Sequence, residues 1–273
     1  MQIRTVLALS LVLVAAPAMA NVYEDASTAT FEFIEPVAGD VWGGARDVLY
    51  DNGPFVNMPG GGWGGADASV LQNSTLLMNT LGFGHQVYYN YLVTDDFTVP
   101  AGDMWSVETI TFFAYQTGAP TSPSTMTAVH VQIWDNPPDM PGANLVFGDL
   151  VTNRLTGTAW SNCYRVTETT LTATNRPIMA DVCSAPVVLG PGTYWVAWQT
   201  DGTLTSGPWA PPIAIWGQPT TGNGEQSLDG GVTYAPAVDS GSLTPQGFPF
   251  IISGTNLTGT EESTWGQVKA LFR

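Results

Sequence analysis

Apolar and polar residues alternate along much of the chain with the two-residue period of β-strands. Six segments combine this period with many Val, Ile, Thr and aromatic residues between Gly, Pro, Asn or Asp. We predict strands over Asp95–Val99, Val107–Tyr115, Ala128–Trp134, Tyr164–Thr167, Thr193–Thr200 and Phe248–Ser253. No amphipathic helix of useful length is indicated before the last residues. The pattern predicts an all-β fold, an antiparallel β-sandwich or jelly roll with long Gly/Pro-rich loops.

Two of these segments predict which side chains face outwards. In Ala128–Trp134 the alternation places Val129, Val131 and Ile133 in the core, so His130, Gln132 and Trp134 share the other face. Thr193–Thr200 carries large aromatic residues on both faces, Trp195 on one and Trp198 on the other. Both faces of that strand are therefore expected to be covered.

The two ends of the chain differ from its middle. Residues 1–20 have an arginine, an apolar run and a small-x-small site, the order of a secretory signal peptide, and the run is short for a membrane anchor, which is the alternative. We expect one β-sandwich domain over residues 21–255. Residues 256–273 are expected to form a tail with a short helical segment that docks as a cap or, alternatively, serves sorting or a partner.

The composition restricts the partners and the cellular compartment. The formal charge is −16 and becomes one unit more negative when the signal peptide is removed. Such a surface repels nucleic acid and anionic lipid, so we expect a secreted, extracellular or periplasmic protein without stable membrane insertion. The only cysteines, Cys163 and Cys183, are expected to form one disulfide in an exported chain, with a redox or metal pair as the alternative.

Residues 48–254 contain a succession of distinctive motifs, which include "DNGPFVNMPGGGWGGADASVLQ", "LGFGHQV", "VTDDFTVPAG", "ITFFAYQTG", "VQIWDNPP" and "GTYWVAWQTDGTLTSGPWAPP". Together they resemble a domain that recurs in exported bacterial proteins, alone or beside peptidase and other extracellular domains. The resemblance implies an exported β-rich accessory or surface domain. It supplies no catalytic residues.

The glycine-rich stretch from Tyr50 to Asn73 invites comparison with phosphate-binding loops. Those loops precede a helix and usually carry a lysine, whereas the only lysine of this chain is Lys269. We therefore predict a packed loop folded against a sheet, with Trp63 buried or displayed.

Acidic residues near predicted strand ends are candidate calcium ligands. Calcium needs several oxygen ligands from converging loops, and the candidates are Asp95, Asp96, Asp135 and Asp139. Asp201, which follows the predicted strand Thr193–Thr200, could supply a further oxygen. Aspartates that cap turns through local hydrogen bonds are the alternative. A structural calcium ion is the only cofactor that the sequence suggests.

Catalytic signatures are few. The two histidines, His85 and His130, belong to none of the familiar nucleophile or metal motifs. A glycosidase needs only two suitably placed carboxylates, and Glu108, expected on the same strand face as Ile110 and Phe112, is the acid to inspect. A glycan hydrolase or lyase is thus the alternative function.

The ten tryptophans are the stronger functional indication. Exposed aromatic rings stack on sugars while amides and carboxylates bond hydroxyls, although a sandwich core also buries tryptophan. Candidate ligand-binding residues are Trp134, Trp209, Trp216, His130 and Gln132. The leading hypothesis is a secreted, non-catalytic module that binds glycan or a cell-surface protein or contributes structure.

Overall fold

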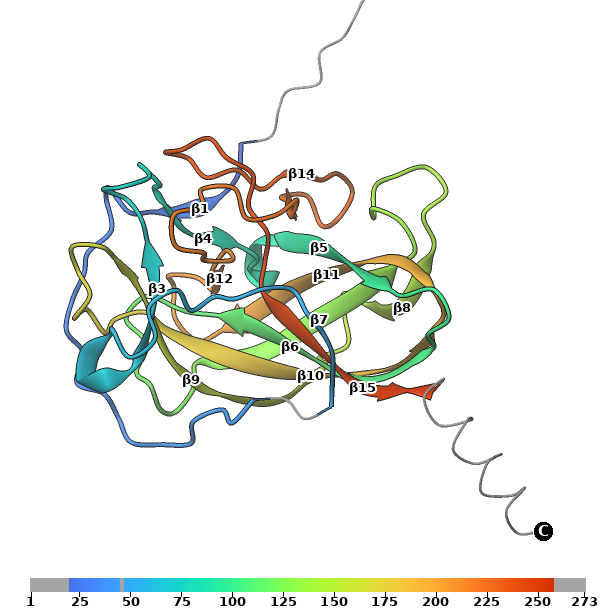
Figure 1. The fold of residues 1–273 in the computed structure, drawn as a ribbon, viewed down its shortest axis with the longest axis horizontal. Helices are drawn as coiled ribbons and strands as arrows, with labels where there is room; N and C mark the ends of the chain where they lie inside the picture. Colours follow the sequence, from blue (N-terminus) through green and yellow to red (C-terminus); the bar gives the residue numbers. More distant parts are fainter. Residues whose placement is uncertain (1–19, 45–46, 258–273) are drawn as a thin grey trace, which may run out of the picture.

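The computed structural model describes residues 20–44 and 47–257, and they form an all-β structure. One six-stranded sheet contains β2 (Val48–Asp51), β15 (Phe250–Asn256), β6 (Trp105–Ala114), β10 (Pro177–Leu189), β9 (Leu155–Thr167) and β3 (Asp67–Leu71) in that order. The other contains β14 (Ala235–Pro236), β13 (Glu225–Ser227), β5 (Leu92–Val99), β11 (Gly192–Gly202), β7 (Met126–Trp134) and β8 (Leu145–Asp149). A three-stranded sheet of β1 (Tyr23–Asp25), β4 (Thr80–Gly84) and β12 (Trp209–Ala210) lies at one end (Figure 1).

The two large sheets pack face to face as a β-sandwich, as the sequence predicts. Phe112 of β6 stacks on Trp198 of β11 with ring centroids 4.6 Å apart, which joins the two sheets through the core. Val129, Val131 and Ile133 of β7 are fully buried in the same cluster. All six predicted strands coincide with observed ones, and only β3 and β9 pair in parallel among the named strands.

Burial follows the alternation on β11 in the predicted way. Trp198 is fully buried between the sheets, and Trp195, on the opposite face, is 9% exposed. Both faces of this central strand are thus covered.

The predicted disulfide is wrong, because both cysteines are free and buried. On β10, Cys183 lies five residues from Ile178, the residue that pairs with Cys163 of β9. At roughly 3.3 Å per residue this separates the cysteines by about 16 Å, far beyond the Cα distance of about 7 Å that a disulfide tolerates. The two cysteines also belong to different core clusters, Cys163 to the one that contains Phe113 and Cys183 to the one that contains Phe112.

The glycine-rich loop folds against a sheet, as predicted. Met58 and Ala68 exchange backbone hydrogen bonds of 3.2 and 3.0 Å, which join the loop to β3. Trp63, in the short 3-10 turn η1 (Trp63–Gly65), is displayed: it is 42% exposed and its ring meets the edge of Phe33.

Two arginines are buried in different ways. Arg176 forms an ion pair of 2.8 Å with Glu24 of β1 and lies over the ring of Phe31, which fastens the N-terminal segment to the sandwich. Arg165 donates instead to neutral groups, the Leu81 carbonyl at 2.7 Å and the Ser69 hydroxyl at 3.0 Å.

One buried carboxyl group has few partners that could stabilise its charge. Asp181 of β10 is fully buried between the sheets and accepts a hydrogen bond from the Thr158 hydroxyl, while its Oδ2 has no hydrogen-bond partner among the residues that the structure describes. Desolvation by burial raises the pKa of Asp181 from 3.8 to about 7, although the Thr158 hydrogen bond opposes the shift.

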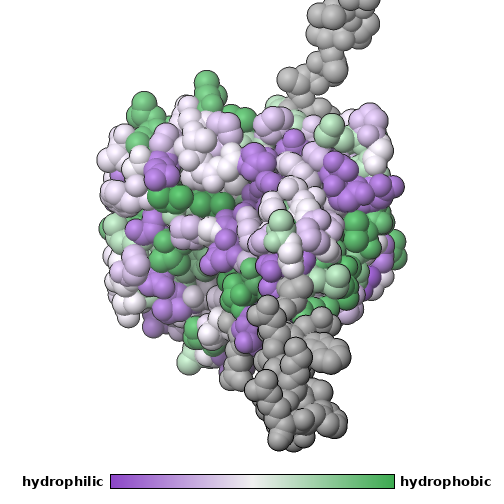
Figure 2. All heavy atoms as spheres, turned by 45° about the vertical axis from the view of Figure 1, so that its right-hand side comes forward, coloured by the Kyte–Doolittle hydropathy of each residue, from purple (hydrophilic) through white to green (hydrophobic). Residues whose placement is uncertain are grey.

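The predicted signal peptide, except for residue 20, and residues 258–273 of the predicted tail lie outside the described residues, whereas Asn256, the first residue of that tail, ends β15. Within the residues that the structure describes, no helix is long and apolar enough to cross a membrane. On the face shown in Figure 2, apolar residues form separate patches with polar residues between them.

Candidate functional site

A cavity of about 350 Å³ lies between the link from β4 to β5 and the segment from the end of β11 to β12 (Figure 1 shows these strands). This volume is at the lower end of the roughly 300–1,000 Å³ typical of small-molecule sites. We call it the tyrosine pocket, and its lining residues are Gln86, Tyr88, Tyr89, Asp201, Gly202, Leu204, Thr205, Gly207 and Pro208.

The β4–β5 link is fixed beside β11 by its backbone. The Thr200 N–H donates to the His85 carbonyl at 2.8 Å, and Gln86 forms a β-bridge with the same threonine. The 3-10 turn η2 (Val87–Tyr89) follows and ends at Asn90, whose φ of 56° is left-handed, a conformation that asparagine tolerates. A short, tightly bonded turn therefore carries the tyrosines.

Two tyrosines form the exposed rim of the pocket. Tyr88 is 82% exposed and Tyr89 is 55% exposed. Their ring centroids are 4.9 Å apart with planes at 84°, and Tyr89 stacks on Tyr91 at 5.4 Å. The pair thus presents ring surfaces in two directions on a supported base.

The opposite wall is held by a buried glutamine. The Gln116 amide donates to the Leu204 carbonyl at 2.7 Å and accepts from the Leu204 N–H at 3.2 Å, so both ends of the side chain secure the segment after β11. A Cβ on Gly202 would lie 2.4 Å from the Gln116 Oε1, which explains why glycine occupies this position. Gly207 has a φ of +96°, and a Cβ at this position would lie 2.7 Å from Trp209 Cδ1.

Besides the hydroxyls of its tyrosines and of Thr205, the pocket has two polar side chains, those of Gln86 and Asp201. Gln86 is 5% exposed, and no hydrogen-bond partner satisfies its Oε1 among the described residues. Asp201, half-buried at the end of β11, accepts a hydrogen bond of 2.9 Å from the Gly202 N–H. The pocket therefore combines aromatic surface with one amide and one carboxylate, groups that can bond hydroxyls or amines.

Three of the sequence-predicted residues share the outer face of β7, next to this site. Trp195, Ala197 and Gln199 of β11 lie opposite Trp134, Gln132 and His130, respectively. The Gln199 amide is 3.0 Å from His130 Nδ1, and the Trp134 indole donates to Gln132 at 3.3 Å. These polar side chains bond one another, and the row leads along β11 to Asp201.

The other two predicted residues, Trp209 and Trp216, are placed differently. Trp209 is half-buried against the cluster that contains Phe113, and its Nε1 donates to Ser206 at 3.3 Å, so it supports the pocket wall from behind. Trp216 is 52% exposed in a separate loop, where the neighbouring Ile215 carbonyl and Gly217 N–H bond the Gln72 side chain.

Neither histidine is placed as a general base in the tyrosine pocket. His85 is fully buried, and desolvation lowers its pKa to about 3, so it is neutral. Desolvation also lowers the pKa of His130, against the opposing charges of Asp149 and Asp201.

The predicted calcium ligands do not assemble into a site. Asp95 is buried and accepts from the Phe248 N–H at 2.7 Å, and desolvation raises its pKa to about 7. The others bond loop groups: Asp96 accepts from Asn223, Asp135 from Asn144, and Asp139 from Tyr234. No group of three His, Cys, Asp or Glu residues suited to a metal ion occurs in the described parts of the chain.

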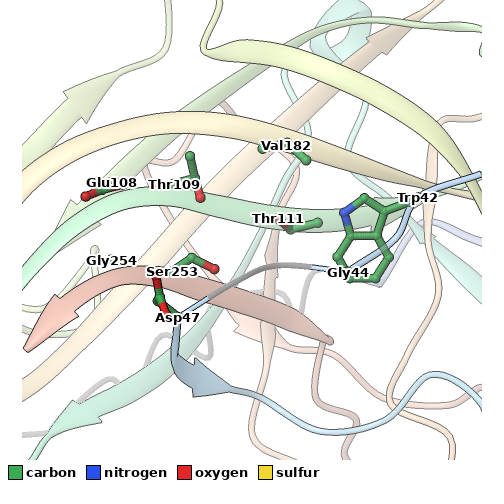
Figure 3. Close-up of a pocket in the computed structure, with 9 residues that line it drawn as sticks. All are labelled: Trp42, Gly44, Asp47, Glu108, Thr109, Thr111, Val182, Ser253 and Gly254. Carbon is green, nitrogen blue, oxygen red and sulfur yellow. The ribbon is translucent and has the colours of Figure 1, made fainter.

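A second cavity of about 220 Å³ lies on the outer face of the other large sheet (Figure 3). The Trp42 ring, the Thr111 and Ser253 side chains and two acids, Asp47 and Glu108, line it. Figure 3 shows the Glu108 carboxylate turned away from the hydroxyls. Gly44 and Asp47 of this cavity flank residues 45–46, which are not among the described residues. The tyrosine pocket is therefore the candidate site.

Glu108 does not share a face with Ile110 and Phe112 as predicted. The pairing of β6 with β15 shifts at this point, from Thr109 opposite Ser253 to Val107 opposite Gly254. Glu108 is therefore the extra residue of a β-bulge, which turns its side chain outwards, and it is exposed.

Sequence reasoning missed the tyrosines and Gln86. The only local signal is "QVYYNY", three tyrosines in four residues outside the alternating strands. Comparisons with family models, curated proteins and solved structures found no significant match to this chain.

Proposed function

We propose that the protein is a secreted β-sandwich module that binds glycans through the tyrosine pocket. The observation that carries the proposal is the pair Tyr88 and Tyr89, displayed beside a cavity that also contains Gln86 and Asp201. Export rests on the N-terminal sequence pattern.

The exposed rings favour recognition over folding. Tyr88 is 82% exposed, so it contributes little to the core, and a tyrosine on a rigid turn loses little conformational freedom when it binds. Sugar rings present apolar C–H faces that pack on aromatic rings and hydroxyls that bond amides and carboxylates. The pocket supplies both kinds of group.

The same lining argues against two other functions. It contains no basic residue, which phosphate-bearing ligands would require. It contains one carboxyl group, that of Asp201, whereas glycoside hydrolysis usually needs two acids across the bond. A binding role is therefore favoured over the alternative hydrolase.

A glycan array with residues 21–273 tests the proposal, followed by titration of the best ligand into the Tyr88→Ala variant. We expect the substitution to weaken binding by about 1–3 kcal/mol, roughly 5- to 150-fold, as loss of an aromatic anchor does. Thermal unfolding should be unchanged because the side chain is exposed.

Trp216→Ala is the matched control, because it removes another exposed aromatic ring away from the pocket lining. Its affinity should equal that of the unmodified protein. Equal losses in both variants, or loss only in Trp216→Ala, would remove the tyrosine pocket from the proposal, and the absence of binding to any glycan would refute the function. A chelator added to the binding assay examines the calcium hypothesis.

A further inference from the structure

The charges around the tyrosine pocket narrow the class of ligand. Of the described residues, only Arg154 and Arg176 take part in ion pairs, with Asp149 and Glu24. The third described arginine, Arg165, is buried. Asp201 therefore has no cationic partner within the described chain.

The titratable groups nearest to Asp201 do not compensate its charge either. His130 interacts with Asp149 and Asp201, but burial lowers its pKa, so the imidazole is neutral at neutral pH. Asp149 already pairs with Arg154 at 3.5 Å. The uncompensated carboxylate of Asp201 makes the electrostatic potential at the pocket negative, and the acidic protein as a whole attracts cations.

The aromatic rim adds a second feature that favours a cation. Tyr88 and Tyr89 contact each other edge to face, with centroids 4.9 Å apart and planes at 84°, so their exposed outer ring surfaces are the ones that a ligand can meet. Ring faces attract ammonium groups within about 6 Å. A carboxylate beside aromatic rings is a suitable environment for an amine.

We propose that the tyrosine pocket binds the ammonium group of an amino sugar, with Asp201 as its counter-ion and Tyr88 or Tyr89 against the sugar ring. This inference rests on the proposed glycan-binding function and names its ligand class. Glycans rich in uronate or sulfate are disfavoured, because their charge has the same sign as that of Asp201 and of the protein.

The test compares two oligosaccharides that differ only at the nitrogen. Isothermal titration measures the binding of a β-1,4-linked glucosamine oligomer and of the N-acetylglucosamine oligomer of equal length. We expect the free amine to bind at least about tenfold more tightly, since replacing a neutral hydrogen bond with a charge-assisted one raises the binding constant by about this factor. Added salt should reduce this preference.

Two variants assign the preference to the pocket. Asp201→Asn should remove the preference for the amine while changing the affinity for the acetylated oligomer little. Asp40→Asn removes an equal charge from an exposed site outside the pocket lining, and it should leave both affinities unchanged.

The outcomes separate this inference from the function on which it rests. Equal affinity for the two oligomers, an unchanged preference in Asp201→Asn, or binding only to neutral or anionic glycans would overturn the amino-sugar assignment and leave glycan binding in place. Failure of every glycan in the array would overturn both.

Discussion

The buried carboxyl of Asp181 makes the stability of this protein fall as the pH rises from acid to neutral. Its pKa is raised from 3.8 to about 7, chiefly by desolvation, and no described residue bonds its Oδ2. Between these two pH values the folded protein holds a proton that the unfolded chain has released. The free energy of unfolding therefore decreases across this range, with the full contribution of the protonated group present below pH 3.8.

The magnitude follows from the shift. A rise of about 3 pKa units corresponds to about 4 kcal/mol at 1.36 kcal/mol per unit, and this amount is lost by about pH 8. Asp181→Asn replaces the protonated acid with an amide of the same shape that can still accept from Thr158. The free energy of unfolding of the variant should therefore not show this decrease with pH.

Urea denaturation of both proteins between pH 4 and 8.5 measures the difference. The quantity of interest is the free energy of unfolding of the variant minus that of the unmodified protein. We expect this difference to increase by up to about 4 kcal/mol from the low to the high end of the pH range, whatever its value at pH 4. Asp95, whose pKa burial also raises to about 7, contributes equally to both proteins and cancels. Parallel stability curves for the two proteins would refute the reasoning.

Two further predictions concern the core. Cys163 and Cys183 should react with a thiol reagent only after unfolding, and a reductant should leave the urea midpoint unchanged; a protein without free thiols when denatured would contradict the structure. Arg176→Met should lower the free energy of unfolding by about 3–5 kcal/mol, because it leaves the Glu24 carboxylate without its cationic partner. Urea denaturation checks this, and a loss below about 1 kcal/mol would show that Glu24 is solvated in the native state.

The period-two pattern predicted the fold where it was regular, as in β7 and β11. It did not identify β10, which has the same length as β9, because Pro177–Leu189 contains two prolines, alanines and a buried aspartate, and its pairing with β6 is irregular between Ser184 and Val187. Strand register is set by contacts across the sheet, so the sequence alone could not show that Cys163 and Cys183 lie far apart.

The site was predictable only in part. The alternation placed His130, Gln132 and Trp134 on one outer face, where the structure also has them. The tyrosine pocket joins residues more than a hundred positions apart, Gln86 and Asp201, through the bridge between Gln86 and Thr200. A short turn such as η2 has no periodic pattern, and its role depends on which strand end lies next to it.

The scarcity of accessible basic residues in the described part of the chain also bears on how the protein withstands proteases. Trypsin-like proteases cleave after lysine or arginine, and the described residues contain only Arg154, Arg165 and Arg176, two of them buried. Both backbone groups of the third, Arg154, are hydrogen-bonded: its N–H donates to the Val129 carbonyl and its carbonyl accepts from the Ser184 N–H, each at 2.8 Å. Cleavage there requires this edge to open first, so the folded protein resists cleavage by such enzymes at the three described arginines.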